Sequence, residues 1–261
     1  MSLSPGVHPT ADIDPSAKIG KNLQIGAYSI VGAEVTLGDD CVLMPHSVVQ
    51  GPSKLGAGNR IFPFACLGME PQDLKYAGER TTLEVGDGNT FREGVTVHRG
   101  TAGGGGITRI GSGDLLMAGT HIAHDCQVGS NVIFANAATL AGHVTVEDGA
   151  TIGAFSGVHQ FCRIGRQAYI GGYSVITQDA LPYVLTVGNR AKSYGINVIG
   201  LERKEFPAES IRDLKQAYRI LFRSHLSLEE SLARLQTEIP EGSEVRYLIS
   251  FIRKSQRGVI R

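Results

Sequence analysis

The 261-residue chain has no tryptophan, no closely spaced pair among its four cysteines and no long apolar run. A helix that crosses a bilayer needs about 20 apolar residues, so we expect no transmembrane span. The first residues also lack the pattern of a signal peptide. Cysteines that lie far apart argue against a zinc ribbon or a disulfide framework. They favour a cytoplasmic protein with free thiols.

The chain also lacks an excess of either charge, since 25 Lys and Arg residues balance 25 Asp and Glu residues. Charge therefore gives no indication of a nucleic-acid partner or of an acidic membrane surface. Glycine, by contrast, is abundant, with 34 residues. In a chain of mixed composition, this content is typical of a fold with many tight turns.

An apolar residue recurs at every sixth position over residues 7–67, 85–97 and 110–176. A period of six fits neither an α-helix nor a β-hairpin. It indicates a parallel β-helix of hexapeptide repeats, in which three hexads form one coil. We expect about nine coils, with each residue stacked about 4.8 Å from the residue three hexads later.

Two breaks interrupt the frame, at about residues 69–84 and 99–109. A solenoid tolerates such insertions as loops that project from a corner, and projecting loops often carry function. The hexads end after Asp179. We therefore assign residues 1–190 to the β-helix and residues 191–261 to a connector followed by a helical domain.

Helical periodicity marks the last part of the chain. One helix face is predicted from six apolar residues: Ile211, Leu214, Ala217, Tyr218, Leu221 and Phe222. Ser227 and Glu230 predict a capping box for a second helix over residues 228–238. Apolar spacing over residues 245–252 predicts a third helix, which ends before Gly258. This domain would also cap the open end of the β-helix, which otherwise exposes unpaired strand edges.

The segment THIAHDCQVG (120–129) places two histidines, an aspartate and a cysteine within a few positions. Cys126 falls on the compact inward position of its hexad, so we interpret it as a core residue. Steps of one coil bring six residues to one edge: His124, Asp125, Gly142, His143, His159 and Gln160. His121 comes from the preceding hexad, and either faces this edge or lies around the bend.

This cluster contains the residue types that acyl transfer to a hydroxyl group requires. His124 can act as a general base near neutral pH. Asp125 beside it can orient the imidazole or stabilise its protonated form. Gly142, stacked on His124, lets a ligand approach a backbone N–H that stabilises an oxyanion. No serine or cysteine nucleophile is needed, so we expect direct attack without a covalent enzyme intermediate.

Two other interpretations fit a group of histidines. Three histidines bind zinc in carbonic anhydrases built on hexapeptide repeats, but we do not find their ligand spacing in this sequence, so we expect no metal. Histidines can also decorate the corners of a β-helix that serves only as a scaffold. Their stacking in register with an aspartate and a glycine argues against that interpretation.

Six segments of the chain together resemble the UDP-N-acetylglucosamine O-acyltransferases of lipid A biosynthesis. They are QDLKYAGE (72–79), VTVHRGT (95–101), HIAHDC (121–126), ATLAGHV (138–144), VHQFCRIG (158–165) and GINVIGLERK (195–204). The resemblance covers essentially the whole chain. It implies a mostly β fold, a left-handed parallel β-helix with a C-terminal α-helical domain, which is an exception to the right-handed crossover rule.

The resemblance also implies an activity. This family transfers an (R)-3-hydroxyacyl group from acyl carrier protein to the 3-hydroxyl of UDP-N-acetylglucosamine, the first step of lipid A synthesis. No cofactor is implied besides the carrier-protein thioester, which is a co-substrate. The family forms a homotrimer with active sites between subunits, which would let the distant first insertion complete a site.

Residue roles follow from the matching motifs. The resemblance makes His124 the general base, Asp125 its partner and Gly142 the N–H donor near the thioester carbonyl. It assigns contacts with sugar, phosphate or acyl groups to six residues: Asp73, Lys75, His121, His143, His159 and Gln160. It places Asn197 and Arg203 in the nucleotide region. Gly172 falls where the acyl groove often ends and leaves room for a longer chain, whereas Tyr169 nearby could shorten the groove.

Other enzymes share the hexapeptide fold. The QDLKYAGE loop argues against the related N-acyltransferase of the same pathway and against acetyl-CoA-dependent acetyltransferases. A 3-amino sugar acceptor stays open, because a general base would serve an amine as well. An acidic carrier protein could dock on residues 200–261, which contain 12 Lys or Arg against 9 Asp or Glu, but a solvated helical surface explains the same count.

Overall fold

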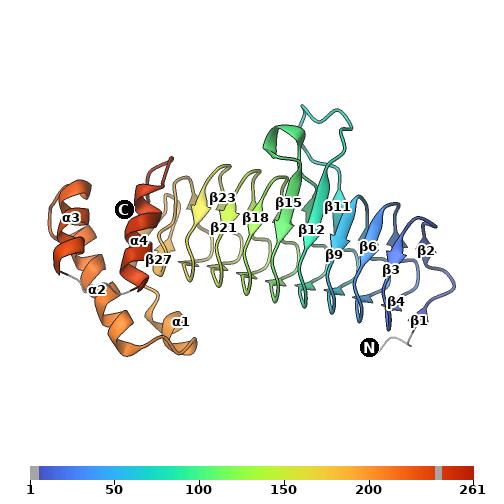
Figure 1. Ribbon diagram of the computed structural model, residues 1–261, viewed down its shortest axis with the longest axis horizontal. Helices are drawn as coiled ribbons and strands as arrows, with labels where there is room; N and C mark the ends of the chain where they lie inside the picture. Colours follow the sequence, from blue (N-terminus) through green and yellow to red (C-terminus); the bar gives the residue numbers. More distant parts are fainter. Residues whose placement is uncertain (1–5, 239–242) are drawn as a thin grey trace.

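The structure, a computed structural model, describes residues 6–238 and 243–261. Short parallel strands wind into a left-handed parallel β-helix, and α-helices gather at its C-terminal end (Figure 1). The fold class therefore agrees with the prediction from the hexads. No helix in this described part is long and apolar enough to cross a membrane.

Within the described residues, the strands form three sheets that are the faces of the β-helix. The first contains, in spatial order, β1 (Gly6–Val7), β4 (Gln24–Ile25), β7 (Val42–Leu43), β10 (Arg60–Ile61), β13 (Thr90–Phe91), β16 (Leu115–Leu116), β19 (Ile133–Phe134), β22 (Thr151–Ile152), β25 (Tyr169–Ile170), β27 (Val184–Val187) and β28 (Lys192–Ile196). The second contains β2 (Asp12–Ile13), β5 (Ile30–Val31), β8 (Val48–Val49), β11 (Cys66–Met69), β14 (Thr96–His98), β17 (His121–Ile122), β20 (Thr139–Leu140), β23 (Gly157–Val158) and β26 (Val175–Ile176). The third contains β3 (Lys18–Ile19), β6 (Val35–Leu37), β9 (Ser53–Leu55), β12 (Thr82–Val85), β15 (Ile107–Ile110), β18 (Gln127–Val128), β21 (Thr145–Val146) and β24 (Arg163–Ile164).

Neighbouring coils pair in the register that the repeat predicts. Ile122 pairs with Leu140, three hexads later in the sequence. The two insertions lengthen single coils, so that Leu67 pairs with Val97, and Val97 in turn with Ile122. Regular pairing resumes beyond the insertions, where Ile110 pairs with Val128 and Val128 with Val146. The hexad frame of the sequence is kept across the first insertion and moves by one position across the second.

The two insertions project side by side from one edge of the β-helix (Figure 1). The first is the loop between β11 and β12, and the second contains the short 3-10 helix η1 (Ala102–Gly104) before β15. The Ala102 N–H donates to Glu79 Oε1 at 3.3 Å, which joins the two loops. Strand residues at the ends of both predicted breaks pair in the third sheet, so the insertions are shorter than the breaks in the hexad pattern.

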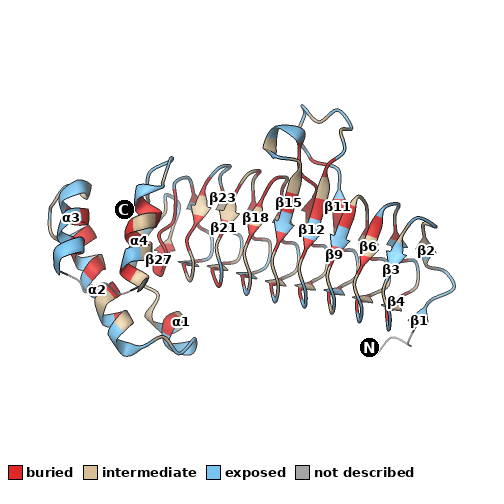
Figure 2. Ribbon diagram, in the orientation of Figure 1, coloured by how far each residue is buried: buried red, intermediate tan, exposed pale blue. Residues whose placement is uncertain are grey.

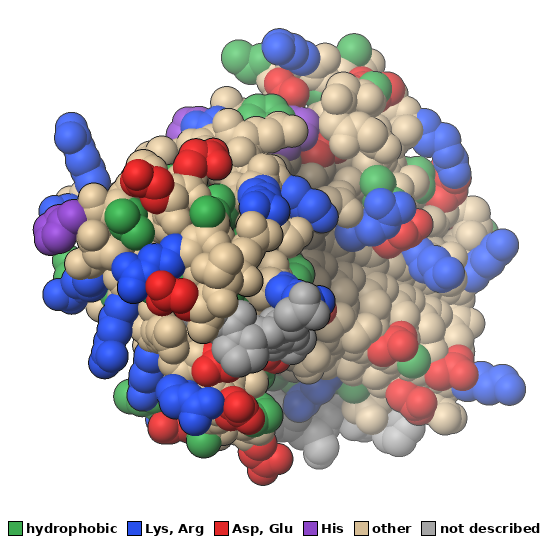
Figure 3. All heavy atoms as spheres, turned by 60° about the vertical axis from the view of Figure 1, so that its left-hand side comes forward, with side chains coloured by type: hydrophobic (Ala, Val, Ile, Leu, Met, Phe, Trp, Pro, Cys, Tyr) green, Lys and Arg blue, Asp and Glu red, His purple; other side chains and the backbone are tan. Residues whose placement is uncertain are grey.

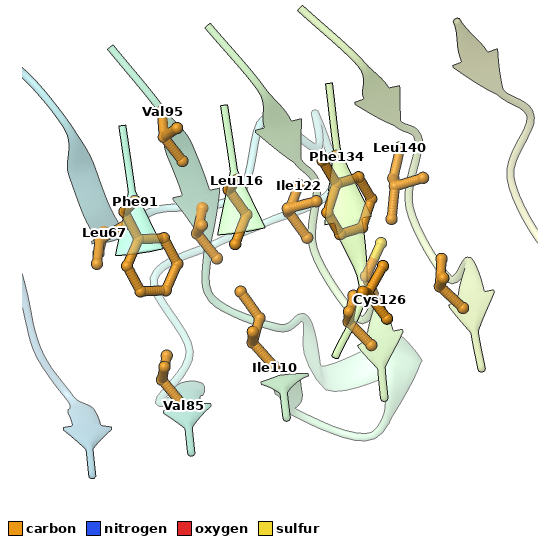
Figure 4. Close-up of a cluster of buried hydrophobic side chains, with 14 of the residues drawn as sticks. Leu67, Val85, Phe91, Val95, Ile110, Leu116, Ile122, Cys126, Phe134 and Leu140 are labelled. Atoms are coloured by element: carbon orange, nitrogen blue, oxygen red, sulfur yellow. The ribbon is translucent and has the colours of Figure 1, made fainter. Parts of the chain in front are cut away.

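The apolar hexad positions fill the interior of the β-helix (Figure 4). Leu67, Phe91 and Ile122 are fully buried, and Cys126 lies among them as a compact core residue. Burial raises the pKa of the Cys126 thiol to about 12, so it is not a thiolate nucleophile at neutral pH. The buried positions recur along the β-helix beyond its first coil (Figure 2).

The C-terminal part contains α1 (Val198–Arg203), α2 (Ala208–Arg223), α3 (Leu228–Glu238) and α4 (Ser243–Arg253). Ile211, Leu214, Ala217 and Leu221 of α2 are buried, as the apolar spacing predicts. The capping box is also confirmed, because the Ser227 N–H donates to Glu230 Oε2 at 2.8 Å and the Glu230 N–H donates to Ser227 Oγ at 3.3 Å. The periodicity did not reveal α1 or the antiparallel pair β27–β28.

The C-terminal end of the β-helix is covered as expected, although helices are only part of the cover. The last residues return to the final coil, where the Asp179 N–H donates to the Gly258 carbonyl and the Ile260 N–H donates to the Asp179 carbonyl, both at 2.9 Å. Ile260 is buried in the core of the β-helix. At the other end, Val7 and Ile19 are 46% and 42% exposed, because the first coil has a neighbour on one side only within the described residues.

Three buried polar side chains occupy equivalent places in successive coils: Asn59, Asn89 and Asp114, here called the asparagine ladder. The Nδ2 atom of Asn59 donates to two glycine carbonyls, and its Oδ1 accepts the Asn89 N–H. Asn89 repeats this pattern toward Asp114. Asp114 Oδ1 accepts the Val132 N–H at 2.7 Å, but its Oδ2 has no partner among the described residues. Burial raises the pKa of Asp114 to about 7.

Candidate functional site

Asp125 forms the buried centre of the site, at the corner between β17 and β18. Its side chain is fully buried, and Thr101 of the second insertion holds both carboxylate oxygens. The Thr101 N–H donates to Oδ1 at 2.9 Å, and its hydroxyl donates to Oδ2 at 2.6 Å. The Asp125 N–H donates to Thr108 Oγ1 at 2.8 Å. Because a buried charge needs hydrogen bonds, the second insertion is what allows a carboxylate at this corner.

His124 lies beside Asp125 with 15% of its side chain exposed. Its Nδ1 is 2.8 Å from Asp125 Oδ2. An ionised carboxylate only accepts hydrogen bonds, so the proton of a neutral His124 is on Nδ1 and its Nε2 has a free lone pair. The carboxylate thus orients the ring as a general base requires.

Gly142 lies against the His124 imidazole from the next coil. A side chain here would place its first carbon 2.5 Å from His124 Cε1 and 2.7 Å from Nε2, too close for either atom. The Gly142 N–H donates no hydrogen bond to any described residue, so it can receive a ligand oxygen. The adjacency predicted from the coil step is therefore present, and the oxyanion role stays a prediction.

His143 completes the group around the carboxylate. Its Nδ1 is 3.8 Å from Asp125 Oδ2, and its ring meets that of His124 edge to face, with centroids 5.1 Å apart. On its other side it stacks on Phe161 at 4.5 Å. Burial lowers the pKa of His143, while the charges of Asp125 and Asp73 oppose this change. The charge of Asp73, in the first insertion, therefore acts on the pKa of His143.

His121 lies next to the site rather than around the bend. Its Nδ1 is 2.7 Å from Thr96 Oγ1, and its ring meets that of His98 edge to face, with centroids 4.9 Å apart. Burial and then the nearby His124 lower the pKa of His121, so its imidazole is neutral at pH 7.

Arg99 anchors the first insertion to the β-helix. Its guanidinium donates to two backbone carbonyls at 2.7 and 3.2 Å and to the Tyr76 hydroxyl at 3.2 Å. Asp73 Oδ1 accepts the Lys75 N–H at 3.0 Å, and the Lys75 side chain is exposed. Since β11 pairs with β14, the loop reaches the coil next to His121 within a single chain.

Three other predicted residues lie farther along the β-helix. His159 and Gln160 are exposed, and His159 Nδ1 is 3.1 Å from the Gln160 carbonyl oxygen. Among the contacts of the described residues, none joins either side chain to His124. Gly172 is also exposed, and a first side-chain carbon there would be 3.3 Å from a backbone oxygen of the preceding coil. The coil step aligns Gln160 with Gly142 without bringing its side chain into contact with the cluster. Gly172 follows Ile170 of the first sheet, so it lies at a different corner from His124, which follows Ile122 of the second sheet.

The two residues that the resemblance assigns to the nucleotide region, Asn197 and Arg203, lie at the start of the helical part. Asn197 caps α1, since its Oδ1 accepts a backbone N–H of the first turn at 3.2 Å and its Nδ2 donates to the Gln167 carbonyl at 3.1 Å. Lys204 Nζ donates to Gln167 Oε1 at 2.6 Å. Both side chains therefore attach α1 to the β-helix, whereas Arg203 is exposed.

Within residues 6–238 and 243–261, one group of side chains could hold a metal ion. His124, Asp125 and His143 each offer a ligand atom, and these atoms lie within 4.8 Å of one another. Two imidazoles and a carboxylate suit zinc or a similar ion. However, Asp125 Oδ2 already accepts the hydroxyl of Thr101 and lies 2.8 Å from His124 Nδ1, so a metal would have to disrupt these contacts.

The hexad frame missed Thr96, His98, Thr101 and Thr108, which contact the site residues. Three of them lie beside or inside the second break, where the coil contains extra residues and a fixed step no longer gives the neighbour. Thr96, His98 and Thr101 do belong to the segment VTVHRGT. A polar segment that leads directly into a break was the available signal, because loops position functional groups.

Comparison with known proteins identifies the enzyme family. A family model for UDP-N-acetylglucosamine O-acyltransferase, domain 2, matches residues 179–260, and a model for bacterial transferase hexapeptides (six repeats) matches residues 16–51 and 143–178. The crystal structure of UDP-N-acetylglucosamine O-acyltransferase from Moraxella catarrhalis is 45% identical, with a TM-score of 0.94, and the match covers 98% of this chain and 99% of that one. The chain belongs to this acyltransferase family.

Two further members of the family match the same share of this chain. The UDP-N-acetylglucosamine acyltransferase from Bacteroides fragilis is 40% identical with a TM-score of 0.96, and the match covers 98% of this chain and 100% of that one. The enzyme from Arabidopsis is 36% identical with a TM-score of 0.85, again over 98% of this chain and 100% of that one. The acyltransferase family resemblance drawn from the six segments is thus confirmed over nearly the whole chain.

Proposed function

We propose that this acyltransferase moves an (R)-3-hydroxyacyl group from acyl carrier protein to the 3-hydroxyl of UDP-N-acetylglucosamine, the first step of lipid A synthesis. One observation carries the proposal. His124 is oriented by a fully buried carboxylate on one side and lies against Gly142 on the other, and the Gly142 N–H donates to no described residue. A base and an oxyanion donor side by side are what direct acyl transfer needs.

The reaction follows from this geometry. His124 Nε2 takes the proton of the sugar hydroxyl as its oxygen attacks the thioester carbonyl carbon. The Gly142 N–H donates to the oxyanion of the tetrahedral intermediate, while Asp125 stabilises the imidazolium. When the C–S bond breaks, the proton passes from His124 to the departing thiolate. The ester and the free carrier thiol are the products, so the protons balance without a cofactor or a metal.

The surrounding residues supply the binding groups in this proposal. Asp73, Lys75, His121 and His143 lie at or near the cluster and would bind the sugar or its phosphates, and Arg203 would bind the nucleotide. His159, Gln160 and Gly172 follow along the β-helix, where the acyl chain would run. A homotrimer would place neighbouring subunits against this edge. The four free cysteines support a cytoplasmic location for the enzyme.

A basic cleft supports carrier-protein docking on the C-terminal helices. The cleft has a volume of about 730 Å³ and lies between β28, α2 and α3. Four cationic side chains line it: Lys215, Arg219, Arg223 and Arg234. Its acidic lining residue, Glu238, is paired with Arg234 at 2.6 Å. At this end of the molecule, lysine and arginine side chains are prominent on the surface (Figure 3). An acidic partner would therefore meet uncompensated positive charge.

The decisive experiment is a direct assay of the purified protein with UDP-N-acetylglucosamine and 3-hydroxyacyl carrier protein. We expect ester formation that a chelator does not diminish. The His124→Ala variant should lose about 1,000-fold or more in kcat, the scale of general-base catalysis. His46→Ala, at a corner outside the site, is the matched control and should keep full activity. Full activity of the His124 variant would exclude the general-base role, and loss on chelation would favour zinc.

A further inference from the structure

Residues 255–261, here called the C-terminal strap, join the last coil of the β-helix to the helical part of the molecule. Two neighbouring side chains of the strap enter different cores. Ile260 is buried in the core of the β-helix, whereas Val259 packs against the apolar cluster that β27 and the four helices form. Because packed cores deform little, a segment with one side chain in each core keeps the two parts in a fixed relation.

Asp179 attaches the strap to the last coil. It is buried, with 1% of the residue exposed, and both of its carboxyl oxygens accept hydrogen bonds. The Ser255 hydroxyl donates to Oδ2 at 2.7 Å, and the Arg163 N–H donates to Oδ1 at 2.8 Å. The backbone of Asp179 bonds in addition to Gly258 and Ile260. Since a buried polar group without a partner is costly, each of these bonds restrains the strap.

The far end of the strap contacts two of the three elements that line the basic cleft. The Ser193 hydroxyl of β28 donates to the Ile260 carbonyl at 2.9 Å, and the Tyr218 hydroxyl of α2 donates to the Ser193 carbonyl at 3.0 Å. Arg261 Nη2 donates to the Leu221 carbonyl at 2.7 Å. This carbonyl belongs to the last turn of α2, where the carbonyls have no partner within the helix.

The same turn of α2 presents positive charge to the cleft. Arg219 and Arg223 both line the cleft, and Leu221 lies between them in the helix. When Arg261 holds the Leu221 carbonyl, the backbone that carries both guanidinium groups stays in place. An acidic partner gains affinity from charges that are already arranged before it binds. The contacts of the strap therefore affect the surface that the partner would meet.

We propose that the C-terminal strap is a positioning element for the acyl carrier protein, which fixes the cationic side of the cleft relative to the last coil of the β-helix. The inference rests on the proposed function, because it takes the cleft as the docking site. Ser255 and Arg261 are positioning residues in this proposal, since neither lines the cleft and both act through the strap on β28 and α2.

Removing one contact at each end of the strap tests this role. Ser255→Ala removes the hydroxyl that bonds to Asp179, and Arg261→Ala removes the donor to α2. We expect each variant to raise KM for the acyl carrier thioester about 5-fold, within the range for residues that act on a site without contacting its ligand. The kcat and the KM for UDP-N-acetylglucosamine should stay unchanged, whereas a purely structural defect would lower the amount of active enzyme and leave KM as it is.

Two matched variants complete the experiment. Ser255→Thr keeps a hydroxyl and should restore the wild-type KM for the carrier thioester. Lys254→Ala removes one positive charge, as Arg261→Ala does, from an exposed lysine directly before the strap, and should leave that KM unchanged. An equal rise in the Lys254 variant would show that net charge alone is responsible, and the proposal would be wrong.

The outcomes separate this inference from the proposed function. If the wild type does not acylate UDP-N-acetylglucosamine from the carrier protein, the proposed function is wrong. If it does and Arg219→Ala leaves KM for the carrier unchanged, the cleft is not the docking site and the inference fails with it. If Arg219→Ala raises that KM and the strap variants do not, the strap has no positioning role. Should Ser255→Ala fail to fold, Arg261→Ala, at an exposed residue, decides the result.

Discussion

Two corners of the β-helix each contain a buried aspartate, and the two carboxylates differ in their hydrogen-bond partners. At the active corner, Asp125 accepts hydrogen bonds at both carboxylate oxygens, from Thr101 and from His124. In the asparagine ladder, Asp114 uses one oxygen and leaves the other without a partner among the described residues. The first corner adjoins both insertions, whereas the second belongs to the plain repeat.

The difference shows what an insertion adds to a repeat. In a plain coil, a buried polar side chain can bond only to the coils above and below, and an asparagine amide suits those carbonyl and N–H groups. An inserted loop brings partners from outside the repeat, so a full negative charge can be buried and used. We expect substitutions at the active corner to affect catalysis, and substitutions in the ladder to affect stability.

The largest expected effect is at Asp125. Asp125→Asn keeps the shape of the side chain but replaces the carboxylate with an uncharged amide. The His124 imidazole then loses the acceptor that fixes its orientation and the negative charge that stabilises its protonated form. We expect kcat to fall about 1,000-fold or more in the carrier-protein assay. Asp114→Asn is the matched variant and should keep wild-type kcat. Equal losses at both positions would contradict the division between the two corners.

Asp114→Asn should instead stabilise the protein. Its folded pKa of about 7 lies above the unfolded value of 3.8, so wild-type stability falls as pH rises from about 4 to about 7 and then levels off. The asparagine does not titrate, and its amide can donate to the neighbouring carbonyls as those of Asn59 and Asn89 do. We expect a gain of about 2–4 kcal/mol at pH 8 and little at pH 4.

Denaturant unfolding of the wild type and the Asp114 variant at several pH values measures this difference. The exposed Asp12→Asn substitution is the control, and should change stability little at any pH. A gain that does not depend on pH would show that Asp114 is ionised in the folded protein throughout.

Gly142→Ala keeps the backbone N–H but adds a methyl group between it and His124, and we expect activity to fall by about 100-fold because the oxyanion donor and the base are no longer aligned. The added carbon would lie 2.5 Å from His124 Cε1, so the ring must move away from its position. Gly157→Ala on the next coil is the control, because nothing lies within 4 Å of the added carbon. Steady-state kinetics of both variants test this, and similar rates for the two would show that the site tolerates the displaced ring.

Thr101→Val should give the smallest effect. It removes the hydroxyl that donates to Asp125 Oδ2 while the backbone N–H to Oδ1 stays. One charge-assisted hydrogen bond corresponds to about 1.5–3 kcal/mol, and we expect about a 10-fold loss in kcat with a lower melting temperature. A Thr101→Ser variant, which keeps the hydroxyl, should restore both values. If it does not, the second insertion supports Asp125 through its backbone alone.

Much of the fold followed from the sequence because the β-helix is almost one-dimensional. Each coil contacts only its neighbours, so a constant step converts sequence spacing into spatial adjacency, as for Gly142 and His124. The amphipathic faces of α2 and α4 followed from their apolar spacing in the same way, whereas α3 followed from its capping box. The short helix α1 and the pair β27–β28 were not predicted, since neither has enough residues to establish a period.

The sequence by itself determined the β-helix, the inward position of Cys126 and the meeting of His124, Asp125, Gly142 and His143, because all of these depend on one local repeat. Only the tertiary structure decided what surrounds that cluster. It showed Thr101 holding both oxygens of Asp125, His98 beside His121, and Ile260 closing the final coil. These contacts join segments through loops and a returning terminus, and no periodic pattern specifies where such segments come to lie.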